Sequence, residues 1–256
     1  MPSTPSVWRD AYRVRSYEIA PDSLLTLPML CNYLQESAGN HAGSFGVATD
    51  QLLAEGRAWV LARLQVAVDR YPAWREDVTV ETWPSALDRL YAQRDFLVRD
   101  ADDTVVARAT SQWFVMDVER RRPTRPPASL VDFERPDRPH ALAPDRTSLA
   151  SLDVPEHERL FSVRRSDLDL NHHVNNVRYV EWALEAAPDA LTESHRPRRL
   201  DVQFRAESLY GDTIRSACGP DASADAPTLL HRVSRESDDR VLALARTTWK
   251  KTSEKT

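Results

Sequence analysis

The stretch of the chain richest in reactive side chains is 167–177, which reads DLDLNHHVNNV. It places three amides, two imidazoles and two carboxylates within eleven residues. Imidazoles and carboxylates are the usual general acids and bases of enzymes, and amides donate hydrogen bonds to developing negative charge. Helix capping by Asn or Asp explains one or two of these residues. The remainder predict a functional site.

Three of these residues, Asp169, Asn171 and His173, occupy alternate positions. Alternate side chains of an extended backbone point to the same side, so we expect the three to converge on one ligand. His172 beside His173 suggests a metal pair, but adjacent side chains of an extended backbone point in opposite directions. We therefore expect His172 to point outward, and we expect neither a metal ion nor a cofactor.

The chain also contains an internal repeat. Seven residues of the fifteen-residue segment from Arg99 to Trp113 recur 136 positions later, between Arg235 and Trp249. A weaker match at a shift of 149 relates the region of residues 14–38 to 163–187. At this shift, positions 169, 171 and 173 correspond to Ala, Asp and Leu at positions 20, 22 and 24. One copy therefore tolerates the loop without the reactive set.

Each copy has the same order of elements. In the first copy, periodicity and turn residues predict a strand at 12–19, a helix at 27–42 and strands at 59–71, 77–84, 90–99 and 104–118. In the second they predict a strand at 159–164, a helix at 175–187 and strands at 198–207, 211–218, 228–236 and 240–250. A long helix followed by an antiparallel meander predicts an α+β fold similar to the hot-dog fold, in duplicate, forming an intramolecular pseudo-dimer.

The proline distribution divides these copies. Residues 123–155 hold seven of the 17 prolines, which predicts an extended linker over the surface. We expect an N-terminal unit at 1–122, a linker at 123–157 and a C-terminal unit at 158–256.

Composition narrows the class of protein. The chain has 256 residues, 41% of them apolar, and a net charge of -5, which argues against a general nucleic-acid binder. No apolar run reaches the ~20 residues of a membrane helix, so we expect no membrane insertion. Two cysteines, Cys31 and Cys218, fit a reducing compartment, and the N-terminal residues lack the pattern of a signal peptide. We expect a cytoplasmic protein. The sequence leaves open whether it forms a homodimer.

The segment DLDLNHHVNNVRYVEWALE resembles the D-L-D-x-N-x-H-V-N-N-V-x-Y motif of acyl-acyl carrier protein (acyl-ACP) thioesterases. Segments 32–50, 59–84 and 94–125 are similar to the N-terminal hot-dog unit of that family, and the resemblance spans roughly residues 12–250. It implies hydrolysis of the thioester between a fatty acyl chain and the phosphopantetheine arm of acyl carrier protein, which terminates fatty acid synthesis. It also implies an acyl-chain-binding first unit and a catalytic second unit.

By position, the resemblance implies catalytic roles for Asp169, Asn171 and His173, and for Glu207 within Arg205-Ala206-Glu207-Ser208 on the next strand. Ser208 stands where many relatives have Cys, so a thiol mechanism has no thiol here. We favour a water activated by Glu207 with His173 in reach, oriented by Asn171, with Asp169 fixing the loop. A Ser208 nucleophile and a covalent anhydride on a carboxylate remain alternatives.

One further motif concerns the carrier. The run 120–125, Arg-Arg-Arg-Pro-Thr-Arg, could dock an acidic carrier protein or could simply be a solvated strand end. Three other functions remain open: an acyl-CoA thioesterase on the same fold, a non-catalytic acyl-binding protein and a hot-dog dehydratase. Chain-length preference depends on which side chains meet in the tunnel, and the sequence does not determine it.

Overall fold

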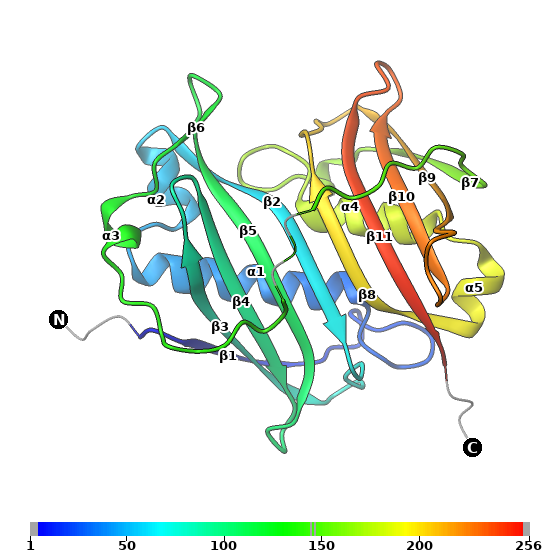
Figure 1. Cartoon of the computed structure of the whole chain (residues 1–256), viewed down its shortest axis with the longest axis horizontal. Coiled ribbons are helices and arrows are strands. Elements are labelled where there is room, and N and C mark those ends of the chain that lie inside the picture. Colours follow the sequence, from blue (N-terminus) through cyan, green and yellow to red (C-terminus); the bar gives the residue numbers. More distant parts are fainter. Residues whose placement is uncertain (1–4, 144, 146, 253–256) are drawn as a thin grey trace. The chain divides into compact units, whose positions relative to one another are not determined.

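The computed structural model of the chain describes residues 5–143, 145 and 147–252 (Figure 1). The chain divides into two compact units, Met1–Asp145 and Arg146–Thr256. Their boundary lies within the proline-rich segment predicted as the linker. In each unit, antiparallel strands form a sheet and a helix lies against it, so the fold is α+β, as the sequence predicts.

In the first unit the strands pair in the order β1-β3-β4-β5-β2, with a short strand β6 added beside β5. The strands are β1 (Trp8–Arg13), β2 (Arg57–Val68), β3 (Asp77–Leu87), β4 (Tyr91–Arg99), β5 (Val105–Asp117) and β6 (Arg122–Thr124). The helices are α1 (Leu27–Ser44), α2 (Thr49–Ala54) and α3 (Ala128–Val131). The long helix α1 packs mainly against β3.

In the second unit the order is β8-β11-β10-β9-β7. The strands are β7 (His157–Ser162), β8 (His195–Phe204), β9 (Thr213–Pro220), β10 (Thr228–Arg235) and β11 (Val241–Lys251). The helices are α4 (Asn176–Glu185) and α5 (Asp189–Ser194), and a single 3-10 turn covers Arg165–Asp167. The helix α4 packs against β9, β10 and β11.

The first unit is organised by α1. Thr26 caps the helix because its hydroxyl accepts a hydrogen bond from the Met29 backbone N–H at 3.3 Å. The buried face includes residues that recur every three to four positions, namely Leu27, Leu30, Leu34, Ala38 and His41. This burial pattern follows the periodicity of the sequence, and the helix starts at the predicted residue.

His41 is a core residue of the first unit. Its side chain is fully buried, and the Arg94 guanidinium donates to its Nδ1 at 3.0 Å. The other ring nitrogen therefore carries the hydrogen and donates to the Pro5 carbonyl at 2.9 Å. Burial and the nearby Arg94 charge lower the pKa of His41 to about 4, so the imidazole is neutral at pH 7.

The second unit begins its helix with a comparable cap. The Asn175 side-chain oxygen accepts a hydrogen bond from the Val177 N–H at 2.9 Å. Behind this cap, α4 buries Val177, Tyr179, Val180, Trp182 and Ala183. The capping explanation of the 167–177 segment thus applies to Asn175.

The two units share local geometry at residues that lie 136 positions apart, the shift of the sequence repeat. Asp103 and Asp239, 136 positions apart, both adopt positive φ, 61° and 53°, in the turns that precede β5 and β11. The Trp113 indole donates to the Ser111 hydroxyl at 2.8 Å, and the Trp249 indole donates to the Thr247 hydroxyl at the same distance. The repeat is therefore a duplication of three-dimensional structure.

Three local predictions differ from the structure. The first strand is Trp8–Arg13 and not 12–19, because the Glu18 carboxylate accepts a hydrogen bond from the Arg15 N–H at 2.7 Å and turns the chain there. The strand predicted at 198–207 ends at Phe204, so Glu207 lies in the β8–β9 connection. The linker is not uniformly extended, because β6 pairs with β5 and α3 forms a helical turn after Pro127.

In the described part of the chain, no helix combines the length and the apolar character that crossing a bilayer requires.

Candidate active site

The loop that carries Asp169, Asn171 and His173 is a tight turn, not extended backbone. The Asp169 N–H donates to the His173 carbonyl at 2.8 Å, and a β-bridge joins Leu168 to Val174. His172 closes the turn with a φ of 60°. The extended backbone from which the convergence of these side chains was predicted is therefore wrong. The three residues lie within one turn, and their convergence on a ligand stays a prediction.

Asp169 organises this turn. One of its carboxylate oxygens accepts hydrogen bonds from the Asn171 N–H at 2.8 Å and the His173 N–H at 3.3 Å. A carboxylate that binds two backbone donors fixes the loop, so that the following side chains are preorganised. Asp169 thus fixes the loop through backbone N–H groups, and its role in catalysis stays a prediction.

His173 faces Glu207. The His173 Nδ1 and the Glu207 Oε2 lie 3.8 Å apart, and the two side chains are 36% and 31% exposed. This separation is within the range of an ion pair when the imidazole is protonated, but it is longer than a hydrogen bond. The structure thus brings the loop before α4, which carries His173, close to the β8–β9 connection, which carries Glu207. Solvent reaches both side chains.

Asn171 presents an unused acceptor. Its side-chain oxygen is buried and has no hydrogen-bond partner among the described residues. A buried amide oxygen without a donor is costly, so such a group fits a position where a water molecule or a ligand supplies the hydrogen bond.

Ser208 is poorly placed to act as a nucleophile. Its side chain is fully buried, and its hydroxyl lies 2.8 Å from the Tyr179 phenol oxygen. Burial raises the pKa of Tyr179 to about 12, so the phenol stays protonated and cannot remove a proton from Ser208 at neutral pH.

The cysteines are no better placed. Both Cys31 and Cys218 are free and buried, and burial raises their thiol pKa values to about 12 and about 11. His172 is exposed, as expected for the outward member of the pair. Within the described residues there is no group of three or more His, Cys, Asp or Glu side chains that could hold a metal ion.

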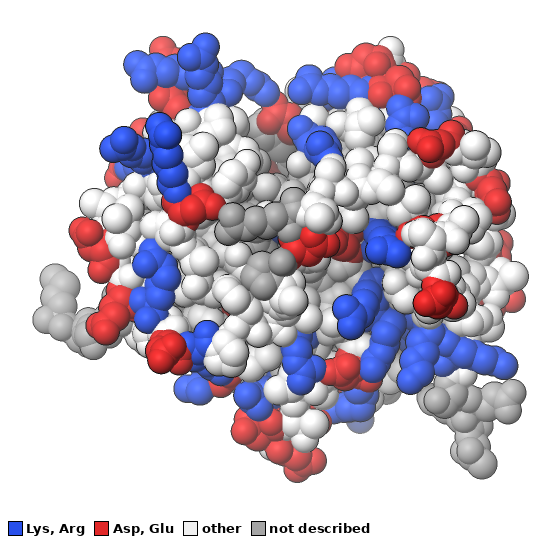
Figure 2. All heavy atoms as spheres, in the orientation of Figure 1, with Lys and Arg blue, Asp and Glu red and all other residues white. Residues whose placement is uncertain are grey.

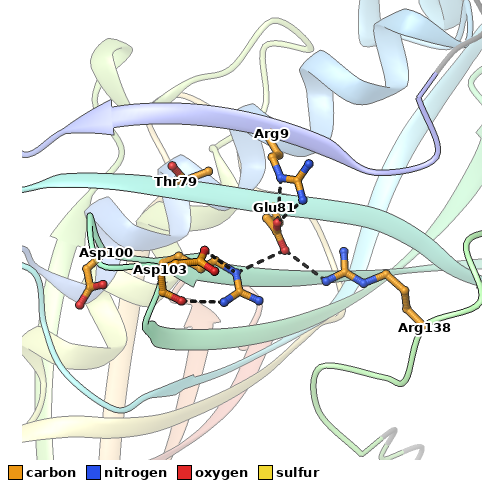
Figure 3. Close-up of a pocket in the computed structure, with 7 residues that line it drawn as sticks. Arg9, Thr79, Glu81, Asp100, Asp103 and Arg138 are labelled. Carbon is orange, nitrogen blue, oxygen red and sulfur yellow. Dashed lines mark hydrogen bonds and ion pairs between the residues drawn. The ribbon is translucent and has the colours of Figure 1, made fainter.

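A polar pocket lies on the first unit (Figure 3). It has a volume of about 470 Å³, and the buried side chain of Glu81 is among the residues that line it. Arg9 and Arg138 donate to Glu81 at 2.8 and 3.2 Å, and Arg99 lies 3.5 Å away. Burial alone would favour the neutral acid, but Arg9 and Arg138 lower the pKa of Glu81. We interpret this network as structural, because it ties Arg138 of the linker to β3.

Sequence reasoning missed the partner of Ser208. Tyr179 is the last residue of the family motif quoted above, but nothing in the sequence shows whether its side chain is only buried or also binds the β8–β9 connection. Burial of its hydroxyl is visible only in the structure, where Tyr179 is 3% exposed.

The fold and the site together define a class of protein. Each unit has the helix-on-sheet arrangement of a hot-dog fold, and the second unit holds an imidazole, a carboxylate and an amide beside the start of its helix. The protein is a double hot-dog protein with a site suited to general acid–base chemistry.

The comparisons with known proteins identify the family. The model of the acyl-ACP thioesterase N-terminal domain matches residues 5–132, and the model of the C-terminal domain matches residues 151–251. The chain belongs to the acyl-ACP thioesterase family.

Solved structures of similar proteins support the fold. The 12:0-ACP thioesterase from Umbellularia californica is 29% identical, with a TM-score of 0.85, covering 98% of this chain and 100% of that one. An acyl-ACP thioesterase from Bacteroides thetaiotaomicron is 26% identical, also with a TM-score of 0.85, covering 96% of this chain and 98% of that one.

Curated relatives include chloroplastic plant proteins. The oleoyl-acyl carrier protein thioesterase of Coriandrum sativum is 33% identical over 85% of this chain and 64% of its own length. The palmitoyl-acyl carrier protein thioesterase of Gossypium hirsutum is 37% identical over 82% of this chain and 54% of its own length. The chain thus spans slightly more than half to about two thirds of these relatives.

Proposed function

We propose that this protein hydrolyses the thioester of fatty acyl-ACP, releasing free fatty acid and carrier protein and so terminating fatty acid synthesis. The observation that carries the proposal is the pairing of His173 with Glu207 in a chain that matches both domains of the family. The relatives named above, which are thioesterases of acyl carrier protein substrates, support the same reaction.

The proposed first step is attack by water on the thioester carbonyl carbon. Glu207 removes a proton from the water as the oxygen–carbon bond forms, and the carbonyl electrons move onto the oxygen. General-base assistance of this kind typically contributes about 10²- to 10⁴-fold to the rate. His173, within 4 Å of Glu207, stabilises the carboxylate in its working orientation when protonated.

Asn171 would orient the reactants. Its buried side-chain oxygen needs a donor, and the attacking water can supply one, while its amide N–H groups can donate to the developing oxyanion. This assignment gives the unpartnered acceptor a chemical role.

The proposed second step is collapse of the tetrahedral intermediate. The carbonyl re-forms, the carbon–sulfur bond breaks, and the pantetheine sulfur leaves as a thiolate. The thiolate takes back the proton that the water gave up, through Glu207 or His173, so the products are a free thiol and a fatty acid.

We propose that the first unit binds the acyl chain and sets its length, because the positions corresponding to the catalytic loop carry non-catalytic residues there. Exchange of residues 12–120 for those of a relative with another preference should change the released chain length while turnover persists. Gas chromatography of the fatty acids released in a bacterial host measures this.

We also propose that the basic segment 120–125, which spans the turn after β5 and the short strand β6, docks the carrier. Arg120, Arg121, Arg122 and Arg125 are exposed, and Figure 2 shows basic side chains gathered over this end of the first unit, with acidic ones among them. An acidic carrier protein would be steered electrostatically toward such a patch.

The carrier experiment compares kinetics on acyl-ACP and on acyl-CoA of equal chain length. We expect hydrolysis of both, with a lower KM for acyl-ACP that rises as salt is added. Reversal of the charges of Arg120 and Arg122 should raise the KM for acyl-ACP and leave the kinetics of a small thioester unchanged. Equal losses on both substrates would contradict docking at this turn. Binding of acyl chains without turnover would contradict the enzymatic proposal.

A cytoplasmic location remains a proposal. It is supported by the two buried free cysteines, which suit a reducing compartment. Fractionation of the source cells tests it.

A further inference from the structure

A backbone hydrogen bond between their neighbours links the segment of Glu207 to the loop of His173. The Val174 N–H, next to His173, donates to the Ser208 carbonyl, next to Glu207, at 3.1 Å. The groups that hold Ser208 in place therefore help to set the position of the Glu207 carboxylate relative to the imidazole, together with Arg235, whose side chain donates to the Glu207 carbonyl at 2.9 Å.

Ser208 is held by a buried tyrosine. The Ser208 backbone N–H donates to the Tyr179 phenol oxygen at 3.0 Å, and the Ser208 hydroxyl shares a second hydrogen bond with it at 2.8 Å. Because α4 carries Tyr179 and also starts directly after the catalytic loop, this pair ties the Glu207 segment to the same helix that orients Asn171 and His173.

The first unit shows that the fold itself does not need this pair. Its corresponding backbone bond is present, since the Leu25 N–H donates to the Pro72 carbonyl at 2.8 Å. Yet Leu30, fully buried, occupies the position of Tyr179, and Pro72, which has no N–H, occupies that of Ser208. The first unit thus keeps this backbone bond with no hydroxyl group at either of the two positions.

Burial of a polar pair costs desolvation free energy that burial of an apolar pair does not. A buried polar pair whose hydrogen bonds are all formed holds its residues in a single arrangement. We infer that Tyr179, through Ser208, is a positioning residue that holds the Glu207 carboxylate at its working distance from His173. This inference rests on the proposed function, in which Glu207 is the general base.

The test uses Tyr179→Phe, which removes both hydrogen bonds and keeps the ring. We expect kcat to fall about 10- to 100-fold, because a base displaced by about 1 Å loses that much, with KM within about twofold. Ser208→Ala keeps the hydrogen bond from the backbone N–H of residue 208 to Tyr179, so kcat should fall less than in Tyr179→Phe. The double variant Tyr179→Phe/Ser208→Ala should be no worse than Tyr179→Phe, because both changes break one unit.

Thr247→Val is the matched control. Thr247 is fully buried in the same unit and bonds the His231 and Trp249 side chains at 2.7 and 2.8 Å, so the change also breaks buried hydrogen bonds. It should lower the melting temperature and leave kcat within about twofold. The inference is wrong if Tyr179→Phe keeps kcat within twofold of the parent. It is also wrong if Thr247→Val lowers kcat as much as Tyr179→Phe does.

Crystal structures of the parent and of Tyr179→Phe separate this inference from the proposed function. We expect the Glu207 carboxylate to move away from its 3.8 Å separation from His173 Nδ1, or to take a second position, in the variant. An unchanged separation overturns the inference. A parent protein that hydrolyses no thioester overturns the proposed function, while the two structures still decide the position of Glu207.

Discussion

Residues 18–26 in the first unit and 167–175 in the second form the same turn with different side chains. In the first, the Ala20 N–H donates to the Leu24 carbonyl at 2.9 Å. In the second, the Asp169 N–H donates to the His173 carbonyl at 2.8 Å. The central residues, Ser23 and His172, have φ values of 67° and 60°.

The difference between the two turns lies in what the side chains do. In the first, Asp22 accepts a hydrogen bond from the Leu24 N–H at 3.1 Å, and the side chains at positions 20 and 24 are apolar. In the second, a carboxylate, an amide and an imidazole occupy positions 169, 171 and 173. The backbone turn is thus a property of the fold, and the reactive side chains occur in only one of its two copies.

The largest expected effect comes from removal of the base and its partner. Glu207→Ala and His173→Ala should each lower kcat about 10²-fold or more, the usual scale for loss of a general base. Steady-state kinetics on acyl-ACP measures this. The control His172→Asn changes an exposed neighbour to a residue that tolerates positive φ, so kcat should stay within about twofold. Loss of activity in this control alone would contradict the assignment.

A smaller loss of kcat is expected at Asn171, and none at Asp22, which occupies the aligned position in the first unit. Asn171→Ala should lower kcat about tenfold or more and raise KM less, because its hydrogen bonds act mainly in the transition state. Asp22→Ala, at the same place in the other turn, should leave kcat unchanged. Thermal unfolding of both variants is needed, since a lost turn or cap can cost ~1 kcal/mol. Equal kinetic losses in the two variants would show that both turns act in catalysis.

Removal of the Ser208 hydroxyl, which tests whether serine is the nucleophile, should have a still smaller effect on activity. Ser208→Ala should keep activity within about tenfold, because the hydroxyl is buried, bonds a protonated phenol and forms no bond to carbon. A fall as large as that of Glu207→Ala, with an acyl-serine seen by mass spectrometry in the parent, would refute the water mechanism.

The smallest effect is on stability, and it compares the buried histidines of the two units. Burial, with the Arg94 charge for His41, lowers the pKa values of His41 and His231 to about 4. In the unfolded chain each imidazole takes up a proton below about pH 6.5, whereas in the folded chain it does so only near pH 4. The free energy of unfolding should therefore fall as the pH drops from about 6.5 to 4, by at most about 1.4 kcal/mol per pH unit for each histidine.

Denaturant unfolding at several pH values measures this slope. His41→Gln and His231→Gln should each be less stable at pH 7 but should each show a shallower pH dependence. An unchanged slope in either variant would show that its imidazole does not resist protonation in the folded protein.

Much of the fold was predictable because it rests on local patterns. The period of the buried face marks α1, alternation marks β2, and the repeated Asp-Asp turns mark the hairpins before β5 and β11. The duplication was visible because Arg99 to Trp113 recurs without gaps. The short helices α2, α3 and α5 were missed, because pieces of four to six residues carry too little periodicity to be recognised.

The candidate residues Asp169, Asn171 and His173 stood out in the sequence by their types and spacing, and Glu207 by its position in the family motif. Their types follow directly from the sequence, and so does the tendency of Asn175 to cap the helix. The tertiary structure alone decided that the loop is a turn held by the Asp169 carboxylate, and that Glu207 lies beyond a strand end, 3.8 Å from His173. It also revealed the bonds between Tyr179 and Ser208. The physical reason is that side-chain type and periodicity are local, whereas distances between segments some thirty residues apart depend on how the helix packs on its sheet.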